Sequence, residues 1–117
     1  MRAWVKIISI LGVFHVFQAW GYPVTPSFSD WNSDRPILPL NQIRYILLHT
    51  TEGEDVHGLK KLTENGEAHY MISSTGEIFQ IMDENRLAKH VREETRWDGH
   101  SDMKLYSLGI EVVGYHY

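Results

Sequence analysis

The stretch SLGIEVVG, residues 107–114, has the composition of a buried strand, yet it carries Glu111 between Ile110 and Val112. A nearly continuous apolar run of this length is typical of a strand that is buried on both faces of a sheet. Burial of a carboxylate costs several kcal/mol unless a partner compensates. Desolvation should raise the pKa of Glu111 toward the range that suits general acid–base catalysis. The alternative is a structural carboxylate paired with an Arg or a Lys.

A second apolar run, Ile43–Leu48, has His49 and Thr50 directly after it in the segment ILLHTTEGED, residues 46–55. Its composition also predicts a strand buried on both faces. The carboxyl ends of strands in α/β sheets usually carry functional groups. His49 is therefore a candidate metal ligand, and a core histidine bonded to a backbone carbonyl is an equally good interpretation.

Local patterns predict the elements between these two strands. They are a helix over 55–64 that stops at an Asn-Gly pair, a hairpin of 68–73 and 77–82 around a Ser-Thr-Gly turn, and an exposed loop over 92–104 that borders the site. Strand, helix, hairpin, loop and strand in this order indicate a mixed β-sheet with helices packed on it. We expect an α/β fold, or α+β in some classification schemes.

The amino-terminal stretch of residues 1–21 resembles a secretory signal peptide. Arg2 and Lys6 precede the apolar run Ile7–Phe17, and Ala19 and Gly21 have the small-x-small spacing of a signal-peptidase site. The run is shorter than the ~20 residues that a membrane span needs. We expect an exported protein, periplasmic or extracellular, without a stable membrane span. A buried helix and an uncleaved anchor are the alternatives.

Residues 22–41 contain all 4 prolines of the chain, among Ser, Asp and Asn. Proline lacks the backbone donor and resists regular structure, so this segment is expected to be an extended lead-in. The domain itself is expected to span residues 42–117.

Composition limits the class of protein. A chain of 117 residues with 43% hydrophobic and 22% charged residues is one globular domain at most. The formal net charge of -4 provides no basic field for a polyanion, so nucleic acid is not an expected partner. With 0 cysteines, any metal must be held by His, Asp or Glu. We expect a monomer.

Together with GEAHYMIS at 66–73, the two segments above resemble the zinc-dependent N-acetylmuramoyl-L-alanine amidases, the family that includes phage lysozyme-amidases and peptidoglycan recognition proteins. The resemblance runs from about Arg44 to Tyr115. It implies an amidase-like fold and a peptidoglycan hydrolase that cleaves the amide between N-acetylmuramic acid and the L-alanine of the stem peptide. A non-catalytic peptidoglycan-binding module is the second hypothesis.

The resemblance also implies roles for individual residues. His49 matches the first Zn²⁺ ligand, and Glu111 matches the glutamate that activates the attacking water. His69 and His90 match histidines that line or brace the cleft, and Thr50 is placed beside them. In phage members a tyrosine that assists catalysis precedes the position of His69, and Ala68 stands there in this chain. Glu111 would then carry the acid–base role alone.

In that family the second zinc ligand, a His, and the third, an Asp or Cys, lie downstream of the strand that contains the glutamate, as does a Lys. We therefore expect this chain to be a fragment, the amino-terminal part of an amidase domain, that is inactive and retains little zinc on its own. The remaining histidines His57, His100 and His116 are expected to lie on the surface.

Overall fold

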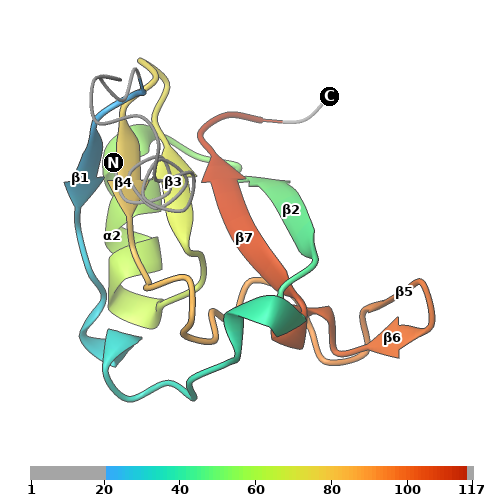
Figure 1. The fold of residues 1–117 in the computed structure, drawn as a ribbon. Helices are drawn as coiled ribbons and strands as arrows, with labels where there is room; N and C mark the ends of the chain where they lie inside the picture. Colours follow the sequence, from blue (N-terminus) through green and yellow to red (C-terminus); the bar gives the residue numbers. More distant parts are fainter. Residues whose placement is uncertain (1–20, 116–117) are drawn as a thin grey trace.

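The computed structural model describes residues 21–115, in which a five-stranded mixed sheet packs against one α-helix (Figure 1). The predicted signal peptide and His116 lie outside these residues. The strands follow the order β1-β4-β3-β7-β2, and only the β3–β4 pair is antiparallel. The sheet consists of β1 Val24–Pro26, β2 Tyr45–Thr50, β3 Tyr70–Ile72, β4 Ile78–Gln80 and β7 Ser107–Val112. This topology confirms the predicted mixed sheet and its α+β class.

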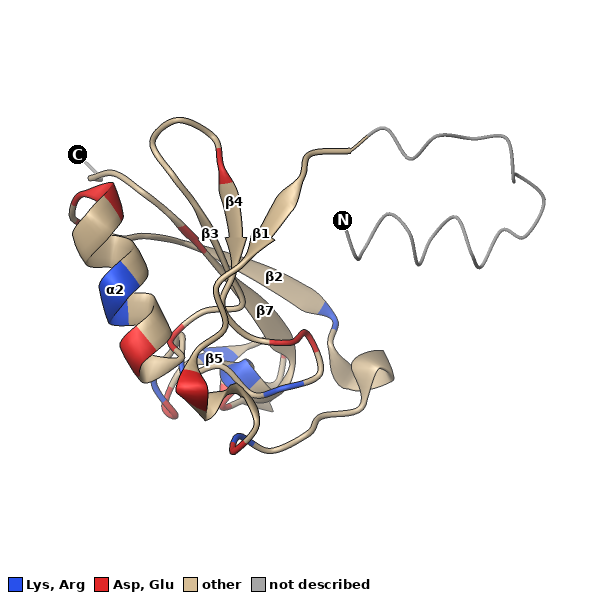
Figure 2. Cartoon of the chain, turned by 90° about the vertical axis from the view of Figure 1, so that its left-hand side faces the viewer, with Lys and Arg blue, Asp and Glu red and all other residues tan. Residues whose placement is uncertain are grey.

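Helix α2, Asp55–Asn65, covers one face of the sheet. Figure 2 shows it from the side, with acidic and basic residues both present along it. Leu62 is buried in the core with Met71 of β3, and a Cβ on Gly58 would lie 3.3 Å from Cγ2 of Thr51, so the helix backbone approaches Thr51 closely. The helix ends at Gly66, whose left-handed φ of 61° closes the last turn. The predicted helix is confirmed.

The predicted hairpin is confirmed as β3 and β4, which are joined through a turn at Gly76. The predicted exposed loop contains more structure than expected. A two-stranded ribbon, β5 Arg96–Trp97 and β6 His100–Ser101, turns at positions 98 and 99, where both φ angles are positive. The 3-10 helix η3, Met103–Leu105, follows it and is largely buried. Within residues 21–115, no helix is long and apolar enough to cross a membrane.

The prediction that Ile43–Leu48 forms a strand buried on both faces was wrong. β2 lies at an edge of the sheet, and Ile46 and Leu48 are 62% and 70% exposed. Its side chains alternate between half-buried and exposed, as in a strand with one covered face. In β7 only Ser107 and Gly109 are buried, and the other four residues are partly exposed. The prediction that this strand is buried on both faces was therefore also wrong. An apolar run predicts a strand, but it does not indicate whether that strand lies at the centre or at an edge of the sheet.

Residues 22–41 are not an extended lead-in in the structure, because they pack on the sheet. β1 pairs in parallel with β4, and Leu38 is buried. The guanidinium of Arg35 donates to the carbonyl oxygens of Asn65 at 2.7 Å and Gly66 at 3.2 Å. An edge strand tolerates proline, since only one of its sides needs backbone hydrogen bonds. The two short 3-10 helices η1, Asp30–Asn32, and η2, Leu40–Gln42, complete this segment.

Candidate functional site

The parallel register of β2 and β7 places His49 directly beside Glu111. Paired residues of neighbouring strands direct their side chains to the same face of a sheet. Both residues line a hollow of about 650 Å³ at the carboxyl ends of the two strands. The structure therefore brings together the two residues that the sequence singles out, although they are far apart along the chain.

Glu111 has the environment of a proton acceptor and not of an ion-paired carboxylate. Burial raises its pKa from 4.5 to about 7, with a smaller opposing influence of Lys61. Lys61 forms its own ion pair with Glu67 at 3.7 Å. Among the residues that the structure describes, the buried oxygen Oε2 of Glu111 has no hydrogen-bond partner. An unpartnered buried oxygen is expected where a substrate or water group completes the site.

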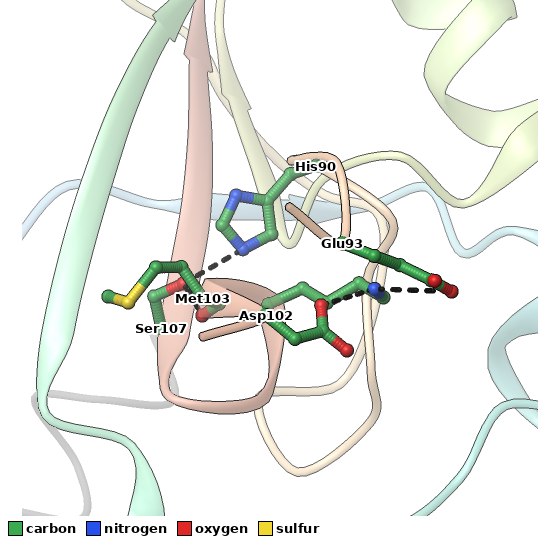
Figure 3. A network of polar contacts seen from close by, with 6 residues as sticks. His90, Glu93, Asp102, Met103 and Ser107 are labelled. Carbon is green, nitrogen blue, oxygen red and sulfur yellow. Dashed lines mark hydrogen bonds and ion pairs between the residues drawn. The ribbon is translucent and has the colours of Figure 1, made fainter. Parts of the chain in front are cut away.

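The His90 ring lies between His49 and Ser107, the first residue of β7, and contacts both through its ring nitrogens. Its Nδ1 lies 3.1 Å from Nε2 of His49, and its Nε2 lies 3.1 Å from Oγ of Ser107, which donates to the carbonyl of Met103 at 2.6 Å. Figure 3 shows the His90, Ser107 and Met103 contacts at the start of β7. Burial, followed by smaller effects of the neighbouring histidines His69 and His49, lowers the pKa of His90 to about 3.

The glycine of the SLGIE segment makes room for this imidazole. A Cβ on Gly109 would lie 2.3 Å from Cγ of His90, so any larger residue would displace the ring. The close approach, and not an unusual φ, is the reason for glycine at this position.

His69 is buried and uses both ring nitrogens. Nδ1 accepts from the backbone N–H of Gly109 at 3.0 Å, and Nε2 donates to the carbonyl of Arg86 at 2.7 Å. Because an N–H can only donate and a carbonyl can only accept, these partners fix the neutral Nε2–H form. Burial, as the largest influence, lowers the pKa of His69. These contacts favour a bracing role between β7 and the segment that precedes His90.

Residues 39–117 match the family model described as N-acetylmuramoyl-L-alanine amidase. The chain belongs to the N-acetylmuramoyl-L-alanine amidase family. No curated protein matches it. Membership supports an amidase-type hydrolase acting on peptidoglycan of the cell wall.

The amidase family is generally zinc-dependent, and the lining of the hollow contains one histidine, His49. His49 supplies an imidazole nitrogen, a common zinc ligand, and burial lowers its pKa, which favours the neutral form that binds metal. Glu111 leaves a buried oxygen free beside it. Within residues 21–115, no group of three or more His, Asp or Glu side chains is arranged to hold a metal.

Thr50 and Glu52 also line the hollow that contains His49 and Glu111. Thr50 is exposed, and its Oγ1 donates to Oε1 of Glu52 at 2.5 Å. Glu52 adopts a φ of 53°, a left-handed conformation that is uncommon for residues other than glycine. Sequence reasoning did not select Glu52; its place in the HTTEG turn directly after His49 was the available signal. Ala68, at the position of the phage tyrosine, is fully buried in the core.

Proposed function

We propose that the protein is an N-acetylmuramoyl-L-alanine amidase in which Glu111 is the general base and His49 is a zinc ligand. The observation that supports this proposal most directly is the pairing of His49 with Glu111 in one hollow, with the pKa of Glu111 raised to about 7. A base with a pKa near the working pH combines a large ionised fraction with good proton affinity. The substrate is the amide that joins the lactyl group of N-acetylmuramic acid to L-alanine.

Glu111 acts twice in this reaction. It first accepts a proton from the water that attacks the lactyl carbonyl, while the new C–O bond forms. It then delivers that proton to the nitrogen of L-alanine as the C–N bond breaks, which releases a carboxylic acid and a free amine. Zinc, when held by His49 and further ligands, supplies polarisation of the carbonyl and a lower pKa for water.

The test compares Glu111→Gln with His49→Ala in the full-length protein. Glutamine keeps the shape of the side chain but accepts no proton, so kcat for stem-peptide release should fall ~10²–10⁴-fold while zinc content is unchanged. His49→Ala should lose zinc and activity together. His57→Ala, on the exposed side of α2, is the matched control and should change neither.

Full activity of Glu111→Gln would eliminate the proposed base. If the wild-type protein binds muropeptides but releases no stem peptide, the non-catalytic peptidoglycan-binding module is the better assignment.

We also propose export to the periplasm or the cell exterior, because peptidoglycan lies outside the cytoplasmic membrane. Sequencing of the secreted protein should then find its amino terminus near Tyr22. An intact Met1 on the exported protein would contradict cleavage.

A further inference from the structure

The hydrogen bond between Ser107 and Met103 has only one possible direction. Oγ of Ser107 lies 2.6 Å from the carbonyl oxygen of Met103, which carries no hydrogen. Two oxygens at this separation repel unless a proton lies between them, so the hydroxyl of Ser107 donates its single hydrogen to Met103. Toward the ring of His90, 3.1 Å away, Ser107 can then only accept.

This direction fixes the protonation of His90. Because Ser107 accepts, Nε2 of His90 must carry a hydrogen. His90 is buried, and no carboxylate of the described residues forms an ion pair with it, so the ring is neutral and its Nδ1 is bare. Gly109 lies close to the ring, since an added Cβ would be 2.3 Å from Cγ and 2.7 Å from Nδ1 of His90. Nδ1 therefore accepts from its one polar neighbour in the described chain, Nε2 of His49 at 3.1 Å.

We propose that Ser107 is a positioning residue, which acts through His90 to fix the proton of His49 on Nε2 and thereby keeps the lone pair of His49 Nδ1 available to the site. This inference rests on the proposed role of His49 as a zinc ligand. No other hydrogen bond to the His49 ring occurs in residues 21–115, so Nδ1 is the nitrogen that remains to bind metal.

The direction of the hydrogen bonds that link His49, His90 and Ser107 matters, because the positions of the two imidazole rings are equally compatible with the reverse direction. If His90 donated from Nδ1, Nε2 of His49 would accept and its hydrogen would move to Nδ1. A protonated Nδ1 cannot ligate a metal, and the partner of the second ring nitrogen commonly decides which nitrogen is free. The hydroxyl of Ser107 selects between two arrangements that the imidazoles alone leave open.

The experiment is ¹⁵N NMR of the imidazoles in the metal-free full-length protein at neutral pH. In the wild type, the proton between the two rings should be bonded to Nε2 of His49, as a coupling across the hydrogen bond would show. In Ser107→Ala the Nε2–H of His90 loses its hydroxyl acceptor and keeps only the backbone of residue 107 beside it, so the arrangement in which His49 carries its proton on Nδ1 should become more populated. Zinc affinity should fall by roughly 10–100-fold in that variant.

Ser29→Ala is the matched control. Ser29 is also buried, and its Oγ accepts from the backbone N–H of Trp31 at 3.2 Å. It should leave both tautomers and the zinc affinity as in the wild type. This comparison separates the loss of a buried hydroxyl from the loss of the Ser107 contact.

A wild-type proton bonded to Nδ1 of His90, or unchanged tautomers in a folded Ser107→Ala, would overturn the inference. If Ser107→Ala does not fold, the wild-type coupling still decides it. The outcome is independent of the amidase assignment. If the expected tautomer is found but no stem peptide is released, the positioning role of Ser107 stands and the proposed function is wrong. If stem peptide is released but the opposite tautomer is found, the proposed function stands and the positioning role is wrong.

Discussion

At the scale of single residues, folding opposes the ionisation of Glu111. Its carboxyl group is half-buried beside Met71 and His49 in the register of the sheet, and no cation in the described chain forms an ion pair with it. A protein keeps such a group at a cost to its stability, and that cost depends on pH. The same desolvation that suits Glu111 to accept a proton should therefore be measurable without any substrate.

Glu111→Gln should be more stable than the wild type at high pH. The pKa of Glu111 is about 7 in the folded protein against 4.5 for the free group, so the folded state binds more protons between these values. Stability of the wild type consequently falls as pH rises from 4.5 to 7. Allowing for solvent screening of a half-exposed group, the variant should gain roughly 1–2 kcal/mol above pH 7 and nothing below pH 4.5.

Urea unfolding of both proteins across this pH range measures the difference. Glu77→Gln, in the exposed β3–β4 turn, controls for the general effect of removing one negative charge. A constant difference between wild type and Glu111→Gln at all pH values would mean that the carboxyl group is not desolvated.

Sequence identifies some residues of the site and misses others for a physical reason. Glu111 is visible because it interrupts an apolar run, and His49 because it directly follows one. Ser107 and Glu52 are not, because a serine at a strand start and a glutamate in a turn are ordinary there. Their importance depends on partners that are distant in the chain or on a backbone angle, and neither leaves a local pattern.

At the scale of elements, the end of α2 depends on the left-handed conformation of Gly66. Its N–H donates to the carbonyl of Leu62 at 2.8 Å. An added Cβ would lie 3.2 Å from Sδ of Met82 and 3.4 Å from both Arg35 and Ser29. The helix therefore ends against the segment that leads into the sheet, and the space there is already filled.

Gly66→Ala should destabilise the protein more than Gly76→Ala. Both glycines have positive φ, 61° and 88°, so alanine costs about 1 kcal/mol of backbone strain at each. A Cβ at position 76 meets nothing within 4 Å, whereas at 66 it crowds three side chains. We expect a loss of roughly 2–3 kcal/mol for Gly66→Ala. Chemical denaturation of the two variants tests this, and equal losses would show that the packing around Gly66 yields freely.

The helix and the hairpin are predictable because their signals are local. An Asn-Gly stop, apolar residues at helical spacing and a glycine turn all lie within the element that they define. The edge position of β2 is not predictable in this way, since it depends on which strands pair. Ile46 and Leu48 have the same composition whether the strand is central or at an edge, and the register with β7 is a property of the sheet.

At the scale of the whole molecule, residues 22–41 add contacts among the helix, the sheet and the segment that carries His90. Arg35 donates to the carbonyls at the end of α2. Leu38 is buried, and its N–H donates to the carbonyl of Asn85 at 2.7 Å. Arg86 in turn donates to the carbonyl of Arg35 at 2.8 Å. The segment that carries His90 is thereby tied to the helix and the sheet through residues that precede β2.

A chain that begins at Gln42 should therefore be much less stable than one that begins at Tyr22. The shorter chain loses β1, which pairs with β4, and the N–H groups of Ser27 and Ser29 that donate to Gln80 and Ile81 at 2.8 and 2.9 Å. It also loses the buried side chains of Arg35 and Leu38. The combined loss should reach about 5 kcal/mol, comparable with the whole stability of a small domain.

Thermal unfolding and urea titration of the two chains give the comparison. The chain from Tyr22 should unfold cooperatively, and the chain from Gln42 should show a lower midpoint and a smaller denaturant slope, because it buries less surface. The His49–His90 contact should weaken in parallel, since Arg86 and the residues after it lose their carbonyl partners in 33–36. If both chains unfold at the same midpoint with the same slope, the proline-rich segment is only a lead-in, as its composition predicts, and the domain begins at β2.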